Sequence, residues 1–185
     1  MPPVRAALLL LAFVLSAGIA HVASLFALPR FSTEDAFSRL EKDAPINALA
    51  PLDDRAAQAI PFFDRATAIA ICRYALDEGP VRLRVKLSET YLSIAFAERH
   101  RGIFNSVSDR AATGGSLDIV IATQKQLERI LALDEEDQVI EEIRIAAPGS
   151  RGLAILKVLV DRPSSRERAE TVLREARCES ERLPD

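Results

Sequence analysis

The segment Val81-Arg82-Leu83-Arg84-Val85-Lys86-Leu87 decides the fold class of this chain. Its apolar residues occupy every second position, and basic residues occupy the positions between them. This period of two is typical of a β-strand with one buried and one solvent-exposed face. The turn residues Asp77-Glu78-Gly79-Pro80 come directly before it. We therefore expect a β-strand here, with Val, Leu and Val side chains in the core.

Strand patterns continue on both sides of this segment. Apolar, β-compatible runs bounded by turn residues predict further strands at 67–76, 91–97, 103–107, 117–122, 139–145 and 153–160. Because short turns join most of these runs, an antiparallel sheet or sandwich with flanking helices is favoured. The predicted fold class is α+β and mainly β, and the mainly β domain with its C-terminal helix is expected over 65–185.

Two helices are predicted inside this domain. In the first, 124–133, residues Leu127, Ile130 and Leu131 are spaced to share one apolar face. The second is the closing helix, 165–178, which would place Cys178 near its end.

Residues 31–64 predict a short helix followed by a proline-interrupted linker. Ser32 can cap the helix, and Phe37 and Leu40 give it an apolar side. Pro45 and Pro51 then interrupt the chain, so we expect irregular structure over 44–61 with one turn at 53–60.

Residues 1–30 predict a transmembrane anchor of the signal-anchor type. The stretch 6–28 has no formally charged residue and would span about 35 Å as a helix, enough for a hydrocarbon core of about 30 Å. The alternative is a cleaved signal peptide, for which Gly18-Ile19-Ala20 offers a passable cleavage site. We favour the anchor because the apolar character continues to Leu28, and we expect the short N-terminal tail to stay inside the cell.

The charge of the remaining chain argues against nucleic acid as a partner. The 185 residues contain 24 Lys and Arg and 27 Asp and Glu. Setting aside Arg5 and Arg30 leaves 22 basic against 27 acidic residues, a balance of −5 for 31–185. Since the body has no basic stripe and the chain has no Trp, we expect no nucleic-acid binding.

Several blocks of the chain resemble a bacterial family known as domain of unknown function 1254. The blocks are Ile71-Cys72-Arg73-Tyr74, Asp77-Glu78-Gly79-Pro80-Val81, Tyr91-Leu92-Ser93, Asn105-Ser106-Val107-Ser108-Asp109-Arg110-Ala111 and Ala176-Arg177-Cys178. The resemblance covers roughly 65–178 and includes the order and spacing of the blocks. One departure is Leu92, where members commonly carry Trp.

The resemblance implies a setting rather than a reaction. In length and N-terminal layout the chain looks like the small membrane-anchored members, which often occur beside a second small protein with a companion uncharacterised domain. We therefore expect a single-pass protein of the bacterial inner membrane, bound to it through residues 6–28, with the C-terminal domain in the periplasm.

The two cysteines, Cys72 and Cys178, are 106 positions apart. This spacing excludes a local metal knuckle and a C-x-x-C redox motif. Outside the cytoplasm, two cysteines permit one disulfide, and the alternative is a pair of buried free thiols. Because the resemblance includes both positions, we expect the disulfide, tying the closing helix to the sheet.

Few residues suggest a site. Asp109-Arg110 is the best polar pair: Arg110 could bind a carboxylate or a sugar hydroxyl, or the pair could simply close a turn. Arg73 is a further ligand-binding candidate. His100, the one histidine of the body, lies in the charged segment Glu98-Arg99-His100-Arg101-Gly102, which is typical of a solvated hairpin tip. We expect no catalytic residue, no metal site and no cofactor.

Two classes of function remain. The first is a non-catalytic, membrane-anchored envelope module that binds a partner protein or maintains the envelope. The second is a ligand-binding or hydrolytic domain acting on an envelope compound, with Arg73, Asp109, Arg110 and His100 at its site.

Overall fold

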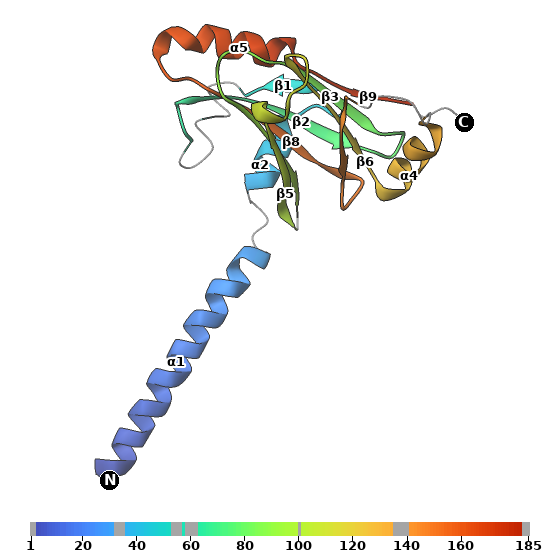
Figure 1. Cartoon of the computed structure of the whole chain (residues 1–185). Coiled ribbons are helices and arrows are strands. Elements are labelled where there is room, and N and C mark those ends of the chain that lie inside the picture. The colour runs from blue at the N-terminus through green and yellow to red at the C-terminus, as the bar shows by residue number, and fades with distance from the viewer. Residues whose placement is uncertain are drawn as a thin grey trace. The chain divides into compact units, whose positions relative to one another are not determined.

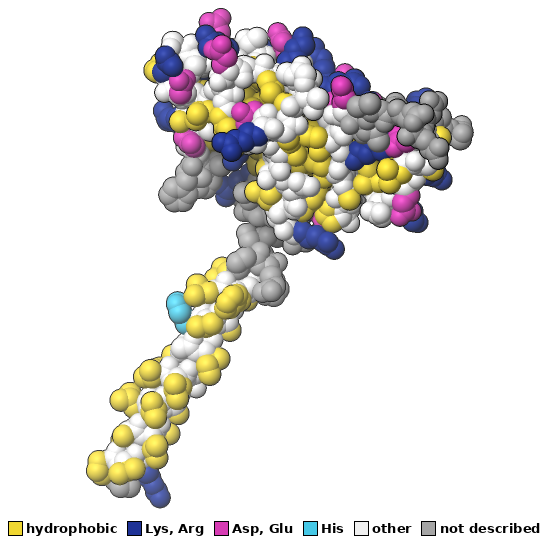
Figure 2. Space-filling model, in the orientation of Figure 1, with side chains coloured by type: hydrophobic (Ala, Val, Ile, Leu, Met, Phe, Trp, Pro, Cys, Tyr) yellow, Lys and Arg dark blue, Asp and Glu magenta, His cyan; other side chains and the backbone are white. Residues whose placement is uncertain are grey.

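The computed structural model of the chain describes residues 3–31, 36–52, 57, 63–99, 101–134 and 141–182. The chain divides into two compact units, Met1–Asp35 and Ala36–Asp185. The first contains helix α1 (Pro3–Phe31), which has 29 residues (Figure 1), and Figure 2 shows hydrophobic side chains along the visible face of this helix. By length and composition, α1 fits a membrane anchor or a signal sequence.

The second unit contains two β-sheets (Figure 1). Sheet A has the strand order β1 (Leu49–Pro51), β2 (Thr67–Ala75), β8 (Arg151–Leu159), β4 (Leu92–Glu98), β5 (Gly102–Ser108). Sheet B has the order β7 (Ile143–Ala146), β6 (Ser116–Ala122), β3 (Val81–Lys86), β9 (Arg177–Ser180). The mainly β, α+β fold is thus confirmed.

One strand pair departs from an antiparallel arrangement. Strands β6 and β7 are parallel, and helix α4 (Gln124–Leu133) lies between them in the chain. A parallel pair needs such a crossover, because a tight turn can only reverse the chain. Strand β7 begins at Ile143, later than the expected 139, and positions 139 and 140 lie outside the described residues.

The core lies between the two sheets. Strand β3 buries Val81, Leu83 and Val85 and turns Arg82 and Arg84 outward, as its alternation predicts. Burying each such apolar side chain contributes about 1.5–3 kcal/mol. From sheet A, the even-numbered residues of β2, β4 and β8 join the same core, which includes Ala70, Cys72, Tyr74, Leu92, Ile94, Phe96, Ala154, Leu156 and Val158.

Helix α5 (Arg166–Glu175) closes the sandwich along one side. Its Ala169 and Leu173 belong to the core, and the helix contacts β2 and β8 of sheet A and β3 of sheet B. The expected closing helix is therefore present but shorter than predicted. It ends at Glu175, and Cys178 lies on strand β9, which pairs with β3 through Cys178 and Leu83. Pairing with the open edge of β3 outweighs the helical propensity of this charged segment.

A second, smaller core lies on the outer face of sheet A. Helix α2 (Ala36–Asp43) packs Phe37 and Leu40 near the buried side chains of Ile71 and Leu153. The expected short helix is present, and its proposed cap, Ser32, lies outside the described residues.

The expected linker contributes a strand. Leu49–Pro51 forms β1 and pairs with β2, with Leu49 opposite Cys72. Pro51 has no amide proton to donate, which suits a sheet edge. Of the turn expected at 53–60, only position 57 lies within the described residues.

Helix α4 has the predicted bounds but not a buried face. None of its residues is buried, and Leu131 is 60% exposed. Polar contacts hold the helix instead. Thr123 and Gln126 form a capping box, and Gln126 Nε2 donates a hydrogen bond to the carbonyl of Leu76 at 2.8 Å.

Candidate functional site

A cavity of about 450 Å³ lies where β2 ends and β8 begins. Helix α2 supplies Phe37 and Glu41, the segment before β1 supplies Ile46 and Asn47, and the two strands supply Arg73 to Ala75 and Arg151 with Gly152. Asp77, Glu78 and Arg99 complete the lining. We call it the Arg73 cavity, after the arginine that lines it.

Arg73 occupies an outward-facing position of β2, opposite Leu153 of β8. Its side chain is 31% exposed, and its Nε is buried with no hydrogen-bond partner among the described residues. The nearest carboxylate is that of Glu41, with Nη1 and Oε1 3.8 Å apart. This distance permits Coulombic attraction but exceeds a hydrogen bond. The guanidinium is therefore held beside an anion that does not satisfy its donors.

The rim of the cavity carries the other charged groups. Arg151 donates through Nη2 to Asp77 Oδ2 at 3.0 Å, and both side chains are largely exposed. Since water screens an exposed pair, this interaction is worth at most about 1 kcal/mol. Arg99 is exposed and has no ion pair within the described part of the chain.

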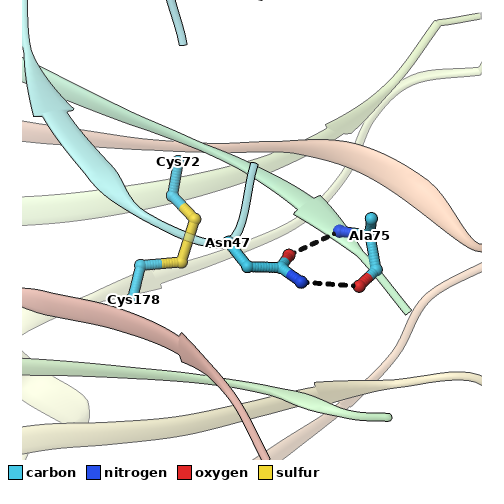
Figure 3. The surroundings of a disulfide bond; sticks show 4 residues. All are labelled: Asn47, Cys72, Ala75 and Cys178. Carbon is cyan, nitrogen blue, oxygen red and sulfur yellow. Dashed lines mark hydrogen bonds between the residues drawn. A yellow bond between two sulfur atoms is a disulfide. The ribbon is translucent and has the colours of Figure 1, made fainter. Parts of the chain in front are cut away.

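Asn47 fixes one wall of the cavity. Its side-chain amide accepts from the backbone N–H of Ala75 at 2.7 Å and donates to the carbonyl of Ala75 at 3.0 Å (Figure 3). Its own backbone N–H donates to the carbonyl of Arg73 at 2.8 Å. Asn47 adopts φ +49, a left-handed conformation that asparagine tolerates better than most residues. These contacts continue the pairing of β2 beyond the short strand β1.

Tyr74 lies between the cavity and the core, since it lines the cavity and also belongs to the core cluster. It is fully buried, and burial together with the negative charge of Glu98 raises the pKa of its phenol. The phenol therefore stays protonated at neutral pH. A Cβ atom on Gly152 would lie 2.2 Å from Tyr74 Oη, so only glycine leaves room for this side chain.

The structure separates the predicted site residues. Arg73 lines the cavity. In sheet A it pairs with Leu153 of β8, which in turn pairs with Ala97 of β4. Asp109 and Arg110 form the short 3-10 helix η1 (Asp109–Ala111) after β5, beyond the Ser93–Ser108 pair at the other end of the sheet. They do not line the Arg73 cavity, and His100 lies outside the described residues.

Glu41, Arg99 and Arg151 also line the cavity, and none of them was predicted as a site residue. They come from a helix, a hairpin and a strand that are far apart in the chain, so no local motif marks them. In the parts of the chain that the structure describes, no three His, Cys, Asp or Glu residues converge to hold a metal ion.

Cys72 and Cys178 form a disulfide, with Cα atoms 6.5 Å apart. Both residues are buried. The bond joins β2 of sheet A to β9 of sheet B, rather than the closing helix to the sheet as expected (Figure 3).

Residues 46–180 match the family model "Protein of unknown function (DUF1254)". The chain belongs to this family. The match begins beside Asn47 and ends within β9, so it includes the wall of the Arg73 cavity, both sheets and both cysteines of this DUF1254 domain. No curated protein matches the chain significantly.

Two crystal structures resemble the DUF1254 chain in fold. One is the VPA0106 protein from Vibrio parahaemolyticus, with a TM-score of 0.54 and 12% identity over 76% of this chain and 31% of that protein. The other is an uncharacterised protein from Burkholderia cenocepacia, with a TM-score of 0.50 and 12% identity over 74% of this chain and 35% of that protein. The chain thus spans about one third of the length of each.

Proposed function

We propose that this DUF1254 chain is a membrane-tethered envelope protein whose β-sandwich binds a second protein in the periplasm. Helix α1 would cross the inner membrane once, with its N-terminus in the cytoplasm. The role of the sandwich in this proposal is non-catalytic: it presents a surface to a partner.

The observation that carries the proposal is the buried disulfide in a domain that follows an apolar helix. Disulfides persist in oxidising compartments such as the periplasm and are rare in the cytosol, where thiols are kept reduced. A helix able to cross a membrane gives the domain a route to that compartment. The positive charge of Arg5 in a short N-terminal tail supports the proposed orientation.

The surface we assign to this partner lies on the outer face of β4 and β5. Since Ile94 and Phe96 of β4 point into the core, Ser93 and Ala95 point outward, and their strand partners Ser108 and Ser106 share that face. These four residues, which we call the small-residue face, are uncharged and short. Such a flat surface allows another element to approach closely, and β5 adds a free sheet edge without a charged residue.

Two apolar side chains flank the small-residue face. Tyr91 precedes β4 and is 51% exposed, and Ile103 of β5 is 66% exposed. Exposed aromatic and aliphatic side chains beside a surface without charged groups are typical of protein interfaces. Among the described residues, helix α2 packs against β2 and β8 of sheet A, near Ile71 and Leu153.

Site-specific photocrosslinking in living cells tests this proposal. A photoreactive amino acid replaces the exposed Ser106 in the full chain, and a matched variant carries it at the exposed Glu170 of α5. We expect one discrete heterologous product from position 106 and none from position 170. No product from position 106, the same product from both positions, or a product that contains only a second copy of this chain would contradict the proposal.

A further inference from the structure

We propose that the Arg73 cavity binds a small organic monocarboxylate with an apolar body. The ligand would place its carboxylate on the Arg73 guanidinium and its apolar part against Phe37 and Ile46. This inference does not depend on the proposed partner protein, because the cavity lies at the end of sheet A that the small-residue face does not occupy.

The carboxylate is inferred from the unsatisfied donors of Arg73. A guanidinium carries five N–H donors in a planar fork that matches the two oxygens of a carboxylate. None of these donors has a hydrogen-bond acceptor among the described residues, and the side chain, which lines the cavity, is 31% exposed. Free guanidinium donors in a cavity wall fit the two oxygens of a ligand carboxylate.

A single negative charge follows from the charge balance of the lining. Three arginines, Arg73, Arg99 and Arg151, face three carboxylates, Glu41, Asp77 and Glu78. Asp77 already takes hydrogen bonds from Arg151, and Glu41 lies 3.8 Å from Arg73. A dianion such as a phosphate monoester would be repelled by these acids more strongly than a monoanion. A cation would in turn leave the Arg73 donors unpaired.

The apolar body follows from the walls and the volume of the cavity. Phe37 of α2 and Ile46, which is 56% exposed, are its largest apolar side chains. A volume of about 450 Å³ lies within the range of small-molecule sites, which is about 300–1,000 Å³. An aromatic or branched acid could bury its carbon skeleton against these residues while the carboxylate reaches Arg73.

Substitutions of Glu41 and Arg73 are expected to change ligand binding in opposite directions. The carboxylate of Glu41 competes with a ligand carboxylate for the same guanidinium and repels it. Replacing Glu41 with glutamine removes the repulsion and should strengthen binding, whereas replacing Arg73 with glutamine removes the forked donor and should weaken it. A cavity that merely attracted apolar molecules would respond to neither change.

The test uses the full chain in lipid nanodiscs and fluorine NMR of 3-(4-fluorophenyl)propanoate, with 3-(4-fluorophenyl)propanamide as the uncharged analogue. Empty nanodiscs correct for partition into lipid. We expect line broadening of the acid and at least about tenfold weaker binding of the amide, because a hydrogen bond to a charged group is worth about 1.5–3 kcal/mol. We expect a similar loss for R73Q, a gain of about threefold for E41Q, and no change for R168Q, an exposed arginine of α5.

Thermal unfolding of each variant shows whether it is folded. If R73Q does not fold, two comparisons test the proposal instead. The first is the binding of the acid against the amide by wild type, and the second is the binding of the acid by wild type against E41Q. Equal binding of the acid and the amide, no binding of the acid at millimolar concentration, unchanged binding by a folded R73Q, or weaker binding by E41Q would each overturn the proposal.

Discussion

Cys72 and Cys178, which are 106 positions apart in the chain, meet between the two sheets with their Cα atoms 6.5 Å apart. Cys72 lies at the centre of β2, and Cys178 lies on the edge strand β9. The disulfide therefore links the second strand of the β-sandwich to its last strand. It is the one disulfide between sheets A and B in the described chain.

Removal of this bond is expected to destabilise the sandwich substantially. In the chain-entropy account, a disulfide closing a loop of this length stabilises the folded state by about 4–5 kcal/mol. We expect the double variant C72S/C178S to lose free energy of unfolding on that order, as measured by urea denaturation of the protein in nanodiscs. Dithiothreitol should lower the midpoint of wild type and leave that of the variant unchanged. An equal response of the two proteins to the reductant would contradict the disulfide.

Substitution of Asn47 should release the end of β2. N47A leaves the backbone N–H and carbonyl of Ala75 without their partners, at a cost of about 1–3 kcal/mol. N47G loses the same bonds but relieves the left-handed backbone, so we expect it to be more stable than N47A by about 1 kcal/mol. Thermal or urea unfolding measures both differences. A wild-type stability for N47A would show that these hydrogen bonds do not hold β2.

Gly152→Ala is expected to destabilise by about 1–3 kcal/mol, the range for overpacking a core. The new methyl group would lie 2.2 Å from Tyr74 Oη and 2.6 Å from the carbonyl oxygen of Ala97. The comparison is Gly114→Ala, where the added Cβ meets no atom within 4 Å and only the backbone at φ +61 is strained. We expect a larger loss of unfolding free energy at 152 than at 114, and the reverse order would contradict the packing of Tyr74 on Gly152.

Acid should weaken the contact at the start of α5. Ser165 Oγ lies 2.7 Å from Asp161 Oδ1, and this hydrogen bond, with that of Arg162, lowers the pKa of Asp161 from its ordinary value of 3.8. Because the folded pKa lies below the unfolded one, the contribution to stability is present above pH 3.8 and is lost as pH falls through the folded pKa.

The variant D161N isolates this pH dependence. We expect the urea midpoint of wild type to exceed that of D161N at pH 6, and the difference to shrink as the pH is lowered below 3.8. A difference that stays constant between pH 6 and pH 3 would contradict the assignment of the depressed pKa to Asp161.

Local patterns were enough to predict most of the fold. The alternation at Val81–Lys86 predicts both the strand and its buried face, and the other strands follow from apolar runs between turns. The errors arose where pairing across the fold decides the structure. The segment after Glu175 reads as helix from its charged residues but forms β9, because the edge of β3 accepts it. Leu49–Pro51 carries no strand signal and pairs only because β2 lies beside it.

The candidate site was much harder to predict. Arg73 was found through its place in a family block, but its neighbours Glu41, Arg99 and Arg151 come from three other elements. Asp109 and Arg110 carry the strongest local signal and lie away from the cavity. A cavity built at the end of a sandwich takes its residues from loops and strand ends that only the folded chain brings together.

The most direct test of the account is the intact mass of the protein extracted from bacterial membranes under thiol-blocking conditions. One measurement reports whether α1 is retained and whether the two cysteines are bonded, which together support a membrane-tethered domain in an oxidising compartment. The account predicts a chain that still contains 6–28 and carries no blocking group on Cys72 or Cys178. A chain beginning near His21, or one with both thiols blocked, would contradict it.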